Sequence, residues 1–196
     1  MRLNDASLDQ LFRTARTHRA FLPREVEDET LRELWSLVSL APTALNSVPL
    51  RVVFVRSPEA KERLLGCVDA GNVDKTKSAP VTAILAFDLA FHEKLPMLAP
   101  GRDLASMFQG PDKADAARET AMFNAQLQAG LFFAAARALG LDVGPMGGFD
   151  KRQVDERFLS GSDWRSFLLV NLGYGDPSVL RPRAPRLAFE TSARIA

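Results

Sequence analysis

The chain has 196 residues, 46% of them hydrophobic and 25% charged, which is typical of a soluble globular protein that buries a sizeable core. Its 25 Lys and Arg nearly balance its 24 Asp and Glu, so the charge argues against a protein that binds nucleic acid or a membrane surface. One cysteine and two histidines exclude an internal disulfide and disfavour a metal site. The first residues lack a signal-peptide pattern, and no apolar stretch approaches the ~20 residues of a membrane span, so we expect a cytoplasmic protein.

The first half of the chain predicts three helices and two strands. Ser7, Asp28 and the Ser57-Pro58 pair are typical residues for helix starts. Continuous apolar and β-branched runs indicate buried strands. In chain order we expect a helix over 7–16, a helix from 28 that Pro42 ends, a strand over 51–55, a helix from 57 and a strand over 81–87.

The second half begins with a connection over residues 89–113, which is long enough to suggest a functional loop or a short helix. A strongly helical pattern then ends at Gly140, a typical C-terminal cap. The remaining expected elements are a helix over 114–139, a brief strand over 141–143, a turn over 144–148, a helix from Asp150 to about 158 and a strand over 167–172.

The residues from 176 onward differ from the rest of the chain in composition, because they are rich in proline and arginine. Pro177, Pro182 and Pro185 alternate with arginines, which excludes a regular helix or a central strand. We therefore expect one domain over residues 1–175 and an extended arm over 176–196 that packs on the domain or on a partner subunit. The irregular mixture of helices and strands predicts an α+β fold.

Five short motifs could each bind a ligand, and each also has a purely structural reading. Arginines in 16–19 and 181–183 can bind a phosphate, but they also suit a solvated helix end and a basic tail. Polar residues in 42–49, the Asn72–Lys75 pair and the glycines of 144–149 can contact a ligand, but ordinary turns look the same. The candidate binding residues are Arg16, Thr17, His18, Arg19, Asn46, Asn72, Lys75, Pro145, Gly147, Gly148, Arg181 and Arg183.

The order and spacing of these motifs resemble the nitroreductase family of FMN-dependent oxidoreductases. More narrowly, four stretches are similar to the Rut-type malonic semialdehyde reductases of pyrimidine degradation: RTH at Arg16, GN..KT..APVTAI at Gly71, ALGLD.GPM.GFD at Ala138 and LGYGD at Leu172. The resemblance implies a central, mainly antiparallel sheet flanked by helices. It also implies a homodimer with the flavin at the subunit interface.

The resemblance further implies that bound FMN passes hydride from NADH or NADPH to a small aldehyde, with 3-oxopropanoate reduced to 3-hydroxypropanoate. Arg19 and Arg183, with Arg16 and Thr17 beside them, would hold the FMN phosphate or the pyrimidine edge. Asn72 and Lys75 would lie at the pyrimidine end, and Gly147 and Gly148 would place N–H groups near the central ring. In this chain Ala15 replaces the first arginine of the family motif, which shifts phosphate binding toward Arg183. Gly147 replaces an acidic residue of some relatives, so the choice of nicotinamide and of substrate stays open.

Other functions fit the same residues. A nitro or quinone reductase of broad specificity would need no partner for a substrate carboxylate, and a flavin-binding protein could lack turnover. An interaction module without a ligand is a further alternative. For an acidic aldehyde, His92, Lys94 and Arg102 are candidate carboxylate partners, and Phe91 and Phe108 would exclude water. The residues identify no proton donor.

Overall fold

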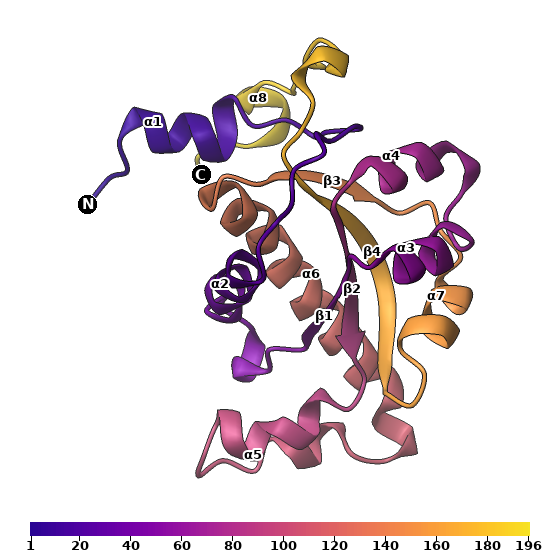
Figure 1. Ribbon diagram of the computed structural model, residues 1–196. Coiled ribbons are helices and arrows are strands. Elements are labelled where there is room, and N and C mark those ends of the chain that lie inside the picture. The colour runs from indigo at the N-terminus through magenta and orange to yellow at the C-terminus, as the bar shows by residue number, and fades with distance from the viewer.

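A four-stranded antiparallel sheet lies at the centre of the protein, which we describe over residues 1–196 from a computed structural model (Figure 1). The strands run in the order β1 (Leu50–Val55), β2 (Val81–Asp88), β4 (Trp164–Gly173) and β3 (Asp142–Met146). Every residue of β2 is buried, as its continuous apolar run predicts. The predicted α+β class with an antiparallel sheet is confirmed.

Helices cover both faces of the sheet (Figure 1). On one face, α2 (Asp28–Ser39) packs on the long α6 (Ala114–Ala138), and together with the sheet they enclose a core cluster of 23 buried residues. On the other face, α3 (Pro58–Leu65) and α7 (Lys151–Phe158) enclose a cluster of only 8. The larger hydrophobic core therefore depends on α6.

Several predicted boundaries are confirmed by capping hydrogen bonds. The Ser57 side chain accepts from the Ala60 N–H at 3.2 Å, and Asp150 accepts from the Gln153 N–H at 3.0 Å. The cap predicted at Ser7 is wrong. Asn4 instead caps α1 (Asp5–Leu8), which continues as a wider turn over Asp9–Arg13, so the helix begins one turn earlier than expected.

The predicted turn at 144–148 is partly wrong, because β3 continues through Gly144 and Pro145 to Met146. Pro145 is tolerated because β3 pairs with β4 alone and so lies at the sheet edge. The N-terminal segment covers that edge, with the His18 N–H bonded to the Val143 carbonyl at 3.0 Å. A Cβ on Gly144 would lie 2.6 Å from the His18 carbonyl oxygen, so glycine permits this close approach.

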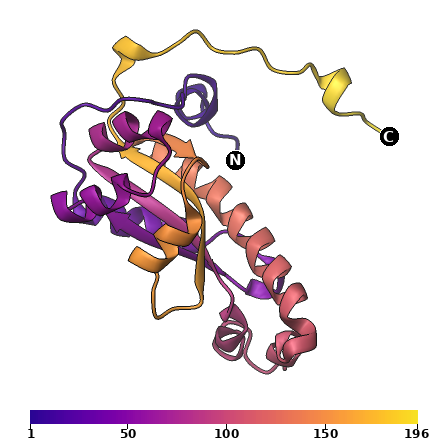
Figure 2. The same ribbon diagram turned by 90° about the vertical axis from the view of Figure 1, so that its right-hand side faces the viewer.

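The connection over 89–113 folds into short helical pieces rather than an open loop. They are a 3₁₀ turn at Phe91–Lys94, α5 (Leu95–Leu98) and 3₁₀ turns at Ala105–Phe108 and Pro111–Lys113. α4 (Val73–Ser78) precedes β2, and α8 (Phe189–Ser192) lies near the end of the chain. Figure 2 shows the last residues running away from the body of the molecule. None of the helices combines the length and apolarity needed to cross a membrane.

Candidate functional site

The two arginine motifs lie against each other although they are at opposite ends of the chain. Arg183 donates to the carbonyls of Arg13 and Ala15, both at 2.8 Å, and Arg16 donates to the carbonyl of Arg181. They enclose a hollow of about 470 Å³ that we call the arginine hollow. Its lining residues are Phe12, Ala15, Arg16, Thr17, Arg19, Arg137, Val179, Leu180, Arg181, Pro182, Arg183, Ala184 and Arg186. With six arginines and no carboxylate, this lining suits an anion.

Arg137 is a member of the arginine hollow that the sequence analysis did not single out. It lies in the last turn of α6, donates to the Leu11 carbonyl at 3.0 Å, and keeps a buried Nε without a hydrogen-bond partner. The pKa of Arg137 is lowered, mainly because the side chain is partly buried. The nearby Asp142 carboxylate opposes this shift, and the neighbouring Arg183 adds to it. A basic residue at a helix C-terminus is ordinary, so its sequence carries no signal of a site.

His18 points away from the arginine hollow although its neighbours in the motif line it. Its side chain is buried, with Nε2 3.3 Å from an Asp142 carboxylate oxygen. The ring packs on the backbone of Gly175, where a Cβ would lie 1.9 Å from Nδ1. The structure therefore places this imidazole between β3 and the segment that follows β4.

A second group of predicted residues meets where α4 faces the end of β3. The Asn72 amide donates to the Gly148 carbonyl at 2.7 Å, and the Lys75 ammonium donates to the Asn72 side-chain oxygen at 2.5 Å. Gly148 is required there, because a Cβ would lie 2.6 Å from both the Asn72 Nδ2 and an Asp69 carboxylate oxygen. Gly147 is exposed, and a Cβ there would meet nothing within 4 Å, so the backbone at this point leaves room for a flat ligand. We call Asn72, Lys75 and Gly148 the lysine cluster.

Asn46 lies at the other end of the sheet. Its amide donates to the Leu98 carbonyl of α5 at 2.9 Å. α4 precedes β2 and α5 follows it, so the eight residues of β2 separate the two ends by roughly 23 Å. The structure thus places Asn46 beside the 89–113 segment and away from the lysine cluster of its own chain.

The segment that carries Asn46 is strained. Leu45, Asn46 and Val48 have φ values of 58°, 53° and 39°, a region that residues other than glycine rarely adopt. Two buried amides of α6 hold the segment: Asn124 accepts from the Ala44 N–H at 2.7 Å and Gln128 from the Leu50 N–H at 3.0 Å. Neither residue belongs to one of the five sequence motifs, although a polar residue within an apolar helix is a usable signal.

The candidate substrate partners in the 89–113 segment are only partly together. His92 and Phe108 line a hollow of about 330 Å³ between this segment and the start of α6, whereas Lys94 and Arg102 lie outside it. Phe91 is fully buried and packs edge to face on Phe108 at 5.0 Å between ring centroids. Phe91 is therefore a core residue, and only Phe108 faces the hollow.

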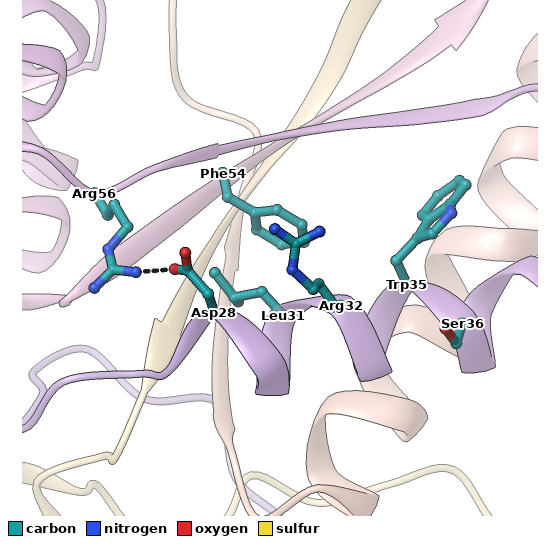
Figure 3. A pocket seen from close by; sticks show the side chains of 7 residues that line it. All are labelled: Asp28, Leu31, Arg32, Trp35, Ser36, Phe54 and Arg56. Carbon is teal, nitrogen blue, oxygen red and sulfur yellow. Dashed lines mark hydrogen bonds and ion pairs between the residues drawn. The ribbon is translucent and has the colours of Figure 1, made fainter.

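Another hollow, of about 530 Å³, opens between α2 and β1 (Figure 3). Asp28 and Arg56 form an ion pair at one end, and Trp35 lies toward the other (Figure 3). It contains none of the predicted binding residues and adjoins the unpaired edge of β1. A large volume by itself does not identify a binding site. We therefore assign the candidate functional site to the arginine hollow and the lysine cluster, which contain the predicted binding residues.

Comparisons with known proteins agree with this fold. The nitroreductase family model matches residues 12–174. A protein of Stenotrophomonas maltophilia named "putative NADH dehydrogenase/NAD(P)H nitroreductase" is 55% identical over 194 residues, which cover 99% of this chain and 98% of the relative.

Two solved structures have the same fold. A Bacillus subtilis protein described as a "putative nitroreductase" superposes with a TM-score of 0.83 at 23% identity, covering 98% of this chain and 100% of the other. An Exiguobacterium sibiricum protein described in the same words, solved in complex with FMN, has a TM-score of 0.83 at 20% identity and covers 100% and 99%.

Proposed function

The chain belongs to the nitroreductase family, and from this premise we propose that it is an FMN-dependent oxidoreductase that uses NADH or NADPH. The observation that carries the proposal is the meeting of the two arginine motifs around one hollow that has no carboxylate. Bound FMN would supply hydride chemistry, accepting an electron pair from the nicotinamide and passing it to the substrate. The protein would supply binding, orientation and electrostatics.

The residues of this chain fit FMN in charge and in shape. Arg16, Arg19 and Arg183 would bind the phosphate, with the unpartnered Nε of Arg137 behind them. Lys75, held by Asn72, would place a positive charge at the pyrimidine end and stabilise the anion formed on reduction. Gly147, which has open space on its Cβ side, would lie near the ring system. The roles of His18, Asn46, Pro145 and Arg181 stay predictions.

We propose a homodimer with the flavin at the subunit interface. Leu37, Leu40 and Leu131 are exposed around a hollow of about 330 Å³, and all eight of its lining residues are hydrophobic. Such a surface is typical of a protein–protein interface. Asn46 and the 89–113 segment lie far from the lysine cluster of their own chain, so they would join a flavin site only across two subunits. A second subunit therefore accounts for both features.

The arm over 176–196 gives the same proposal a second support. Residues 179–184 and Arg186 of the arm line the arginine hollow, but Leu187, Phe189 and Ile195 are exposed, and the end of the chain runs away from the body of the molecule (Figure 2). Apolar side chains on an extended segment need a surface to cover them. We propose that residues 1–175 form the domain and that the arm packs on the partner subunit, for which the hollow of Figure 3 is available.

The proposed substrate is a short acidic aldehyde, with 3-oxopropanoate reduced to 3-hydroxypropanoate. Its support is the resemblance of four sequence stretches to Rut-type enzymes, and the hollow that contains His92 could receive a carboxylate. The alternative is a nitro or quinone reductase of broad specificity, which the name of the Stenotrophomonas relative favours. A flavin-binding protein without turnover is the third candidate. The predicted cytoplasmic location stays a prediction.

The test begins with the absorbance spectrum of the purified protein, where bound flavin gives a yellow colour. Arg183→Glu should lose flavin, whereas Arg194→Glu, a matched arginine of the arm outside the arginine hollow, should keep it. Oxidation of NADH or NADPH then separates an enzyme from a flavin carrier. If kcat/KM for a nitroarene or quinone exceeds that for 3-oxopropanoate by about tenfold, or ~1.4 kcal/mol, the broad-specificity alternative replaces the aldehyde reductase. A colourless protein without affinity for added FMN refutes both.

A further inference from the structure

Lys61 is a half-buried cation whose three N–H groups are all used. It lies on α3, and its Nζ donates to the Thr76 carbonyl, to the Ala79 carbonyl at 2.8 Å and to the Thr82 hydroxyl oxygen at 3.1 Å. The Thr82 hydroxyl gives its own proton to the Asn171 side-chain oxygen at 2.8 Å, so toward Lys61 it can only accept. All three partners are therefore acceptors, which matches the three N–H donors of an ammonium.

No carboxylate pairs with this ammonium. The charged groups that face the hollow around it are Arg24 before α2, Arg56 after β1, Glu62 on its own helix and Lys77 on α4. Burial lowers the pKa of Lys61 to about 8. A neutral amine keeps only two N–H groups, so deprotonation leaves one of the three acceptors without a donor.

These contacts tie Lys61 to the C-terminal end of α4. A helix of six residues is too short to be stable by itself, and its last carbonyls have no partner within the helix. The Lys61 ammonium satisfies the Thr76 carbonyl in the last turn and the Ala79 carbonyl just beyond it, and its charge suits the negative end of the helix. The other end of α4 begins at Asn72, and Lys75 lies between the two ends.

We propose that Lys61 is a positioning residue: its ammonium fixes the end of α4 and thereby holds Asn72 and Lys75 in place to bind the flavin. The inference rests on the proposed function, because it assigns the lysine cluster to FMN. Lys61 touches neither the arginine hollow nor the lysine cluster. Its effect on the flavin therefore passes through α4.

The lowered pKa of Lys61 sets the sign of its pH dependence. Between about 8 and the ordinary lysine value of 10.5, an unfolded or locally opened chain binds a proton that the folded chain has released. The contribution of Lys61 to the folded arrangement therefore rises with pH in this range. A loss of flavin affinity at high pH is not expected from Lys61, so the proposal is tested by substitution at a fixed pH.

The experiment measures the Kd of FMN by quenching of its fluorescence at pH 7. Lys61→Met, which removes the donors to the end of α4, should bind FMN about tenfold more weakly than wild type. Lys61→Arg, which keeps a charged donor, should restore most of that affinity, a rescue that lost packing alone would not show. Lys77→Met is the matched control: Lys77 faces the same hollow but forms no hydrogen bond, so this variant should bind FMN as wild type does.

A Kd of Lys61→Met equal to that of wild type overturns the proposal, as does a Kd of Lys61→Arg that is no better than that of Lys61→Met. If Lys61→Met does not fold, Lys61→Gln takes its place. If neither wild type nor any variant binds FMN, the proposed function fails, and amide exchange of residues 73–78 in the flavin-free protein tests Lys61 separately. Their protection should be lower in Lys61→Met than in wild type and should be restored in Lys61→Arg. Equal protection in wild type and Lys61→Met refutes the role of Lys61.

Discussion

Replacing Gly148 with alanine tests whether the lysine cluster binds the flavin. The added Cβ would lie 2.6 Å from the Asn72 Nδ2 and 2.6 Å from an Asp69 carboxylate oxygen, closer than real Cβ contacts. Both atoms are the ends of side chains, which can swing away, so the backbone need not move. The clash therefore breaks the Asn72–Gly148 hydrogen bond of 2.7 Å and frees Lys75 from its partner, while the fold is kept.

The expected magnitudes follow from the contacts that are lost. One neutral hydrogen bond is worth about 0.5–1.5 kcal/mol, so the free energy of unfolding of the flavin-free protein should fall by that amount. Displacing a charged donor costs the complex about 1.5–3 kcal/mol, which corresponds to a roughly 10- to 100-fold rise in the Kd of FMN. Denaturant unfolding measures the first quantity and fluorescence titration the second.

Two neighbouring glycines serve as controls. A Cβ on Gly147 or Gly71 meets nothing within 4 Å, so neither Gly147→Ala nor Gly71→Ala should destabilise the flavin-free protein. Gly71→Ala should also keep its FMN affinity, whereas Gly147→Ala should bind FMN more weakly if the flavin lies against Gly147. An unchanged Kd in Gly148→Ala would refute the assignment of the lysine cluster to the flavin. A loss of stability in Gly147→Ala equal to that of Gly148→Ala would refute the steric argument.

Two further predictions concern α6. Asn124→Ala leaves the Ala44 N–H without its acceptor and releases the strained segment over 43–48. The free energy of unfolding should therefore fall by about 1–3 kcal/mol in a denaturant titration, and the enzyme should lose activity. Gln126→Ala on the exposed side of the same helix should lose neither, and equal losses in the two variants would contradict this account. Leu131→Glu puts a charge into the hollow lined by eight hydrophobic residues. It should convert the dimer to monomers, as measured by light scattering, and the monomers should lose flavin. Lys151→Glu, at an exposed residue of α7, should stay dimeric, and a Leu131→Glu dimer with full flavin would show that this face is not the interface.

The sites at the two ends of the sheet show how far sequence reasoning reaches. Asn72, Lys75 and Gly148 were singled out from motif order, and the structure brings them together because α4 and the end of β3 lie side by side. Asn46 came from the same reasoning, yet it lies about the length of β2 away. Motif order does not distinguish residues that meet within one chain from residues that would meet across two.

Local chemistry in the sequence determined most of the elements. The apolar run of β2, the caps at Ser57 and Asp150 and the helical pattern of α6 depend on neighbouring residues, so they are readable without a structure. Only the tertiary structure decided the rest. Gly144 and Pro145 are strand residues because they pair with Asn171 and Val170 of β4, and Lys61 is half-buried because it is bonded to the end of α4. Both depend on contacts between segments distant in sequence, and no local pattern encodes such contacts.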